Sequence, residues 1–282
     1  MWPFKASSST TLVKPGTTDG SNQAGEWDRN RGTASNGRFL IGKRRAGPLC
    51  GDGTPREVAL HRIHSNALCA SGDHEKALSL LEEFCDANPT NTDASLTLAV
   101  WQTWFGHAAD YEATRRRLVH QALGTDQAGT AERAAKAYRI CSSADAAMLA
   151  NALALAQSAV ELGKDSRLLP WYRLGLGLAQ YRNGHYDEAL ESLAQVEQTV
   201  GGNNQDIQGI ARYFRAMSLF KQGRAPEARF LFSQEEARMQ PAPKDQARPV
   251  AGGNLVSHDV LIWWLAHQEA KSVLDEPVTA KH

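Results

Sequence analysis

Long apolar runs and an excess of either charge are both missing from this chain of 282 residues. No apolar stretch approaches the ~20 residues that a membrane-spanning helix needs. The first residues also lack the apolar core of a secretory signal. Lys and Arg number 31 and Asp and Glu number 31, so the net charge is zero. That balance argues against general binding to nucleic acid or to membrane surfaces. We expect a cytoplasmic protein with neither a membrane nor a nucleic-acid partner.

Cysteine is scarce, and its pattern points to no disulfide framework. The four cysteines include no CxxC pair, and we read them as buried reduced thiols. The densest group of possible metal ligands is His61, His64, Cys69 and His74. The two histidines at 61 and 64 share one helix face, but Cys69 points elsewhere and His74 follows a turn. We therefore expect no bound metal.

Sequence motifs of catalysis are missing as well. The chain contains no Gly-rich phosphate loop before a strand, no kinase catalytic loop, no Walker motif and no GxSxG. We expect no cofactor and no catalysis. An enzyme built on a helical fold of another type stays open as an alternative, since Ser/His/Asp catalysis leaves no fixed local motif.

What the chain does contain is organised in four parts. Residues 1–55 are rich in Gly, Ser, Thr, Asn and Pro, with eight basic against four acidic residues. They predict a disordered tail, because they cannot bury enough apolar surface to offset ordering entropy. Residues 56–240 have helical periodicity, 241–254 read as a Pro- and Gly-containing linker, and 255–282 carry a C-terminal helix with Ser257 as its N-cap. The pattern predicts helices over 56–71, 74–87, 92–105, 109–122, 128–140, 145–163, 168–183, 186–199, 205–222, 225–238 and 257–276.

A helix–turn–helix unit recurs within the helical region. Its clearest copy runs from Gly177 to Leu193, with a turn glycine at Gly184 and a small residue at Ala189. Gly177 is a small residue where we expect the two helices to cross. In three copies a turn glycine is followed by alanine five residues later and by a bulky apolar residue four further on. These triplets are Gly72, Ala77 and Leu81; Gly184, Ala189 and Leu193; and Gly223, Ala228 and Phe232.

This unit resembles the tetratricopeptide repeat, whose 34-residue period carries the same turn glycine, small alanine and closing proline. The copies span 58–91, 170–203 and 209–242, and the copy at 170–203 also has the Leu176-Gly177 pair. The resemblance implies an all-α superhelix, a solenoid whose repeats stack to bury a continuous core. The C-terminal helix then serves as a cap, or Trp263-Trp264 contact a partner.

Two helix pairs depart from the pattern. Near 92–122 the turn holds Gly106, but the next alanine, Ala113, comes seven residues later, which predicts a loop two residues longer. The pair near 128–163 has no turn glycine at all. On the helix near 109–122, Arg115, Arg116 and Arg117 fan around the axis. We read them as a solvated face, with Glu112 pairing with Arg115 or Arg116; the alternative is an anion-binding site.

The resemblance also implies where a protein or peptide partner binds. In this family the first helix of each unit lines a groove. Carried over by alignment, the lining residues here are Arg62, Asn66, Trp171, Leu174, Leu178, Tyr181, Tyr213, Met217 and Phe220. The alternative is that the aromatic residues among them pack between helices.

A narrower resemblance concerns Phe105-Gly106, 110–113, 131–137 and 264–270. These segments are similar to the helical-repeat region of large bacterial serine/threonine kinase signalling proteins of planctomycete type. That likeness implies a sensing or docking module, with no kinase activity of its own. Two functions therefore follow from the sequence: a non-catalytic scaffold that binds a protein, and an accessory or truncated module of such a kinase.

Overall fold

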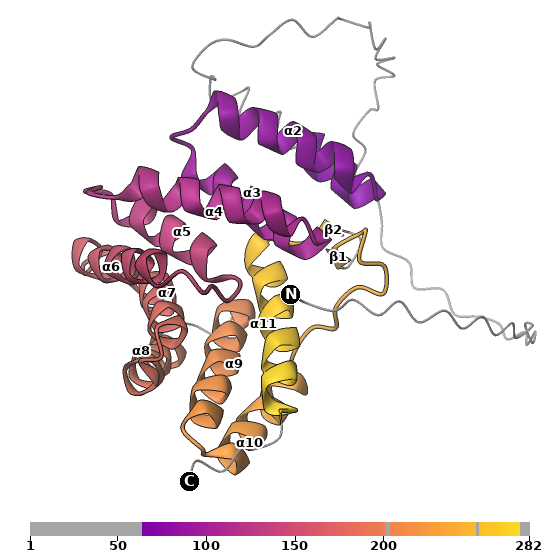
Figure 1. Ribbon diagram of the computed structural model, residues 1–282. Helices are drawn as coiled ribbons and strands as arrows, with labels where there is room; N and C mark the ends of the chain where they lie inside the picture. The colour runs from indigo at the N-terminus through magenta and orange to yellow at the C-terminus, as the bar shows by residue number, and fades with distance from the viewer. Residues whose placement is uncertain (1–63, 201–203, 252–253, 277–282) are drawn as a thin grey trace, which may run out of the picture. The chain divides into compact units, whose positions relative to one another are not determined.

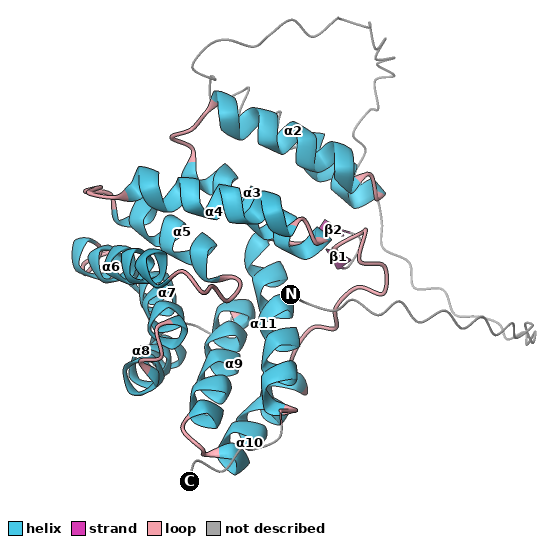
Figure 2. Ribbon diagram, viewed as in Figure 1, coloured by secondary structure: helices cyan, strands magenta, loops and turns pink. Residues whose placement is uncertain are grey.

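The described part of the chain is mostly α-helical (Figure 2), as its helical periodicity predicts. A computed structural model describes residues 64–200, 204–251 and 254–276. The predicted tail over 1–55 and Arg62 lie outside these residues. Residues 64–71 are helical, and they precede α2 (His74–Ala87), α3 (Thr92–Phe105), α4 (Ala108–Ala122), α5 (Ala128–Arg139), α6 (Ala146–Leu162), α7 (Leu169–Arg182), α8 (Tyr186–Thr199), α9 (Gln205–Lys221), α10 (Ala225–Glu236) and α11 (His258–Leu274). The predicted bounds of α2 to α11 agree with these to within two residues.

Helices that follow one another in the chain pack against one another, from α2 through to α10. In addition, alternate helices contact each other in the order α3, α5, α7, α9 (Figure 1). These four helices therefore form one continuous row. The last helix, α11, packs on α9, on α10 and also on α3, at the opposite end of that row. One apolar core joins all of them.

Four of the helix pairs are joined by the same tight turn around a left-handed glycine. Gly184 has φ +79°, its N–H donates to the carbonyl of Tyr181 at 3.0 Å, and the N–H of His185 donates to Gln180 at 2.9 Å. This bond pattern is the Schellman motif, which ends a helix most easily at glycine. The same two bonds and a positive φ recur at Gly72, Gly106 and Gly223.

The α7–α8 pair crosses closely because Gly177 has no side chain. A Cβ atom placed there would lie 2.5 Å from Cγ of Leu193. Ala189 and Leu193 are both fully buried. The sequence predicted this role for Gly177, and the structure confirms it.

The turn at Gly106 corrects one sequence prediction. The loop is not longer than in the other pairs, because α4 begins two residues after Gly106, as α8 does after Gly184. Tyr111 therefore takes the position of Ala189, and Arg115 takes that of Leu193. Both side chains are buried, with the guanidinium of Arg115 4.8 Å from the ring centroid of Tyr111. The prediction that Arg115 lies on a solvated face was wrong for this reason.

The pair that lacks a turn glycine, α5 and α6, is held by side chains instead. The last carbonyls of α5 have no helical donor. The hydroxyl of Tyr111 donates to Ala137 at 2.9 Å, and the guanidinium of Arg182 donates to Arg139 and Ile140, both at 3.0 Å. Cationic donors at a helix C-terminus also stabilise its dipole. Arg182 on α7 thus supplies hydrogen bonds to the carbonyls at the end of α5, as the backbone N–H groups of the glycine turn do in the other pairs.

The predicted linker between α10 and α11 is ordered against α3. The indole N–H of Trp104 donates to the carbonyl of Gln246 at 2.9 Å, and the side-chain amide of Gln246 donates back to Trp104 at 3.0 Å. Further along, the two-residue strands β1 (Val250–Ala251) and β2 (Asn254–Leu255) pair antiparallel. The sequence indicated no strand here, since two residues are too few for an alternating pattern.

Candidate functional site

The most distinctive site is the surface on which α11 lies. We call this surface the α11 seat and define it by Trp104 of α3, Lys136 of α5, Arg182 of α7, and Gly209 and Tyr213 of α9. Each of these residues contacts or pairs with α11. The first half of α11 is apolar on nearly all sides and is buried from Leu261 to Ala266. A helix that is apolar all round belongs in a core.

The two helices α9 and α11 run parallel and side by side (Figure 1). Trp263 lies against Gly209, and one turn further on in both helices the ring of His267 lies 5.4 Å from that of Tyr213. The N-terminus of α11 is capped as predicted, because Ser257 accepts a hydrogen bond from the N–H of Val260 at 3.3 Å.

An aromatic pair closes the α3 end of the seat. Trp264 is buried, and its ring centroid lies 5.6 Å from that of Trp104. Its indole N–H donates to the carbonyl of Gln240 at 2.9 Å. The polar atom of this large side chain is therefore satisfied inside the core, as burial of a tryptophan requires.

Two ion pairs with little exposure join α11 to the row. Lys136 lies 3.4 Å from Asp259, and Nη2 of Arg182 donates to Glu269 at 2.7 Å. Burial raises the pKa of Asp259, but the charges of Lys136 and His258 and the hydrogen bond from Lys136 together outweigh it, so the pKa lies below its usual value. For Lys136 the opposite holds: burial lowers its pKa, and the charges of Asp259 and Glu132 together with their hydrogen bonds raise it further than burial lowers it. Each partner thus keeps the other charged.

A third buried cation, Arg139, lies between α5 and α7. It is fully buried, and none of its three side-chain nitrogens has a hydrogen-bond partner among the described residues. A Cβ atom on Gly175 would lie 3.0 Å from its Nη2. Burial lowers the pKa of Arg139 to about 9, against the opposing charge of Glu132. The region around the seat therefore contains an unpaired cation beside two paired ones.

Replacing Gly209 by alanine tests how tightly α11 is seated. The new Cβ would lie 2.0 Å from Nε1 of Trp263, so the indole and α11 must shift. We expect the free energy of unfolding to fall by about 1–3 kcal/mol, as for other overpacked cores. The measurement is urea denaturation followed by tryptophan fluorescence.

The matched control is Gly129→Ala on α5, where the added Cβ would meet only the flexible end of Arg133, at 3.4 Å. We expect this variant to gain about 0.5–1 kcal/mol, because alanine is the better helix former. Equal changes of the same sign in both variants would show that α11 is not held against Gly209.

Most of the residues that the sequence placed in a groove lie in the interior. The buried ones are Leu174, Leu178, Tyr181, Tyr213 and Met217. Those with partial exposure are Asn66, Trp171 and Phe220. The hydroxyl of Tyr181 donates to the sulfur of Met217 at 3.6 Å, and Tyr213 lies under His267 of α11. The structure brings Tyr181, Met217 and Tyr213 together as packing between α7, α9 and α11.

The C-terminal helix has more contacts than the sequence indicated. It packs on α9 and α10 and also on α3, and its role as a cap stays a prediction. Trp263 and Trp264, named as a possible partner contact, are both buried. Sequence reasoning missed Lys136, Arg182, Asp259 and Glu269. The one available signal was that two carboxylates interrupt an apolar helix.

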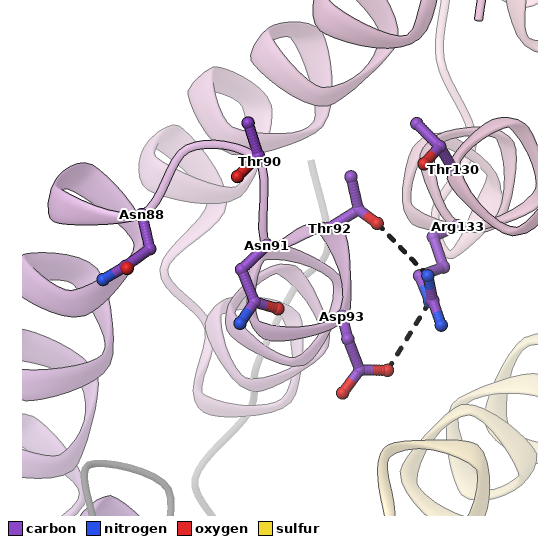
Figure 3. A pocket seen from close by; sticks show the side chains of 7 residues that line it. All are labelled: Asn88, Thr90, Asn91, Thr92, Asp93, Thr130 and Arg133. Carbon is purple, nitrogen blue, oxygen red and sulfur yellow. Dashed lines mark hydrogen bonds and ion pairs between the residues drawn. The ribbon is translucent and has the colours of Figure 1, made fainter. Parts of the chain in front are cut away.

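Two hollows are candidates of a different kind. The first is open and polar, and is lined by Asn88, Thr90, Asn91, Thr92, Asp93, Thr130 and Arg133 (Figure 3). Its cation, Arg133, already bonds Thr92 at 3.3 Å and pairs with Asp93 at 3.5 Å. The second lies between α9, α10 and α11, where Arg212 pairs with Glu197 at 3.0 Å and with Glu235 at 2.9 Å. The guanidinium groups of Arg133 and Arg212 are thus already paired with neighbouring carboxylates.

Other kinds of site find no support in the part of the chain that the structure describes. There, no three His, Cys, Asp or Glu residues are grouped so as to hold a metal ion. Nor, among the same residues, is any helix both long and apolar enough to span a membrane. Comparison of the chain with protein-family models, with curated proteins and with solved structures finds no significant match.

Proposed function

We propose that this chain is a non-catalytic scaffold of tetratricopeptide type, and that it binds a helical segment of a protein partner at the α11 seat. Its repeated unit supports the proposal. Four helix pairs end their first helix in the same glycine turn, and alternate helices form one row. A two-helix unit of this kind cannot cover its own apolar face and must stack on its neighbours.

One observation carries the proposal: the row of α3, α5, α7 and α9 already holds a helix, α11. A helix laid on a surface built by other helices is a recurrent mode of peptide recognition. The seat offers an aromatic contact at Trp104, a close approach at Gly209 and two cations at Lys136 and Arg182. It is therefore shaped and charged for a helix.

The charged groups near the seat fit binding better than catalysis. Lys136 and Arg182 pair with carboxylates of α11. A general acid or base must instead reach a proton of a bound substrate. The balanced net charge of the chain agrees with a protein partner.

The experiment is lysine crosslinking of the tagged full chain in cells of its source, read by mass spectrometry. We expect one partner chain to crosslink at Lys221, whose ammonium lies 3.2 Å from Glu276 at the end of α11, and at Lys271 on the exposed side of α11. The controls are Lys76 on α2 and Lys164 after α6, which are more exposed than Lys221. Partner crosslinks at the controls and none at Lys221 or Lys271 would contradict the proposal.

A further inference from the structure

We infer that the α11 seat recognises an acidic helix, one with an aromatic pair and two carboxylates ten positions apart, and that a partner helix of this chemistry exchanges with α11. The inference rests on the proposed function and specifies its partner. In α11 these features are Asp259, Trp263, Trp264 and Glu269. Ten positions correspond to about 15 Å along a helix, and Asp259 and Glu269 meet cations on two different helices, α5 and α7.

The charged groups that remain around the seat when α11 leaves determine which sign of charge a partner helix must carry. Without α11, the neighbourhood of the seat contains the cations Lys136, Arg139, Arg182 and Arg212. Arg212 stays paired with Glu197 and with Glu235, which lies beside Gly209. The other carboxylates there are Glu132, which lies 2.8 Å from Lys136, Asp206 at the start of α9, and Glu236, which lies 3.0 Å from His267 of α11. Burial, together with the charge of Asp259, raises the pKa of Asp206. Arg182 would then have no carboxylate, and Arg139 has no hydrogen bond in either case. A helix without carboxylates leaves buried cations unpaired, which is costly.

Buried ion pairs also indicate recognition because they specify position more than they stabilise. Replacing such a pair by apolar residues is often neutral or stabilising, whereas breaking it is costly. An apolar helix could settle on the seat in several registers. A shift by one turn would move Asp259 about 5.4 Å from its place beside Lys136. The two pairs therefore admit one register and one charge pattern.

The C-terminal half of α11 leaves a side open to a competitor. Gln268, Lys271 and Ser272 are exposed, while the polar residues at 259 and 269 are half-buried. The α10–α11 connection is tied to α3 mainly through Trp104 and Gln246. Contact of an incoming helix can therefore begin at the exposed half and proceed toward the tryptophans.

The test uses the full chain and two synthetic peptides. One peptide has the sequence of residues 255–276 with a fluorescent label, and the other is the same peptide with D259N and E269Q. The receptors are the natural chain and the full chain carrying D259N/E269Q, whose own α11 is weakened while the seat is unchanged. We expect the acidic peptide to bind the variant chain at least about tenfold more tightly than the neutral peptide does. We expect the natural chain to bind both peptides weakly, since α11 competes.

Hydrogen exchange of α11 and circular dichroism accompany the binding measurement. The variant should keep its helical content but exchange α11 amides at least about tenfold faster, because local opening of α11 no longer breaks two ion pairs. Adding Lys136→Met to the variant receptor should reduce its preference for the acidic peptide, because Lys136 is the partner of Asp259.

Three outcomes would overturn the inference. Equal binding of the two peptides would show that the seat does not select a helix by its carboxylates. The proposed scaffold function would not be affected by that result. Unchanged protection of α11 in the variant would make α11 a fixed core helix, and the scaffold function would then be judged by its crosslinks alone. A concentration-dependent dimer of the natural chain, measured by light scattering, would assign the seat to α11 of a second copy.

Discussion

Replacing Trp264 by alanine is expected to lower the free energy of unfolding by about 3–5 kcal/mol, the range seen when a buried tryptophan is truncated. Trp264 is 1% exposed, its ring centroid lies 5.6 Å from that of Trp104, and it donates its indole N–H to Gln240. The change leaves a cavity between α3 and α11 and a carbonyl without its donor. Urea denaturation with circular dichroism at 222 nm measures the loss without relying on the tryptophan signal.

The matched control is Phe230→Ala on α10. Phe230 is a large aromatic residue on a helix, but it is 65% exposed. We expect its removal to change stability by no more than about 0.5 kcal/mol. A similar loss in both variants would mean that the α3–α11 contact contributes nothing particular to the fold.

Replacing Arg182 by methionine is expected to cost about 3–5 kcal/mol, as for other buried ion pairs that lose one partner. The guanidinium bonds two carbonyls at the end of α5 and the carboxylate of Glu269 on α11. Methionine fills much of the space but leaves the half-buried carboxylate of Glu269 without a cation. Hydrogen exchange should show faster opening of both α5 and α11.

Arg139→Met gives the contrasting result. Arg139 is equally buried, but its guanidinium makes no hydrogen bond among the described residues. Exchanging an unpaired buried charge for an apolar side chain of similar length should leave stability unchanged or raise it by about 1–2 kcal/mol. A loss as large as that of Arg182→Met would show that Arg139 is paired in solution.

The sequence predicted the helices well because their ends are marked by local chemistry. The turn glycines Gly72, Gly184 and Gly223 and the N-cap Ser257 act within five residues of their own position. The same local pattern gave a wrong loop length after Gly106. Alignment on Ala113 required a longer loop, whereas the structure keeps the turn and accommodates Tyr111 and Arg115 in place of alanine and leucine. Alignment by residue type fails when a larger side chain takes a packing position.

The candidate site was predicted only in outline. The alignment predicted that Tyr213 and Met217 line a groove for a partner, whereas both side chains are fully buried in the structure. Tyr213 is covered by α11, where the ring of His267 lies 5.4 Å from that of Tyr213. These two residues are far apart in the chain. No periodicity within α9 carries that information.

By itself, the sequence determined an all-α chain, the positions of its helices, the glycine turns and the close crossing at Gly177. Each of these depends on backbone geometry or on side chains a few residues apart. Only the tertiary structure decided that Arg182 caps α5, that Lys136 and Arg182 meet the carboxylates of α11, and that α11 lies across the row. Arg182 and Glu269 are 87 positions apart, and Trp104 and Gln246 are 142 apart. Such pairs form because packing brings separate helices together, and a periodic pattern within one helix cannot specify which other helix it meets.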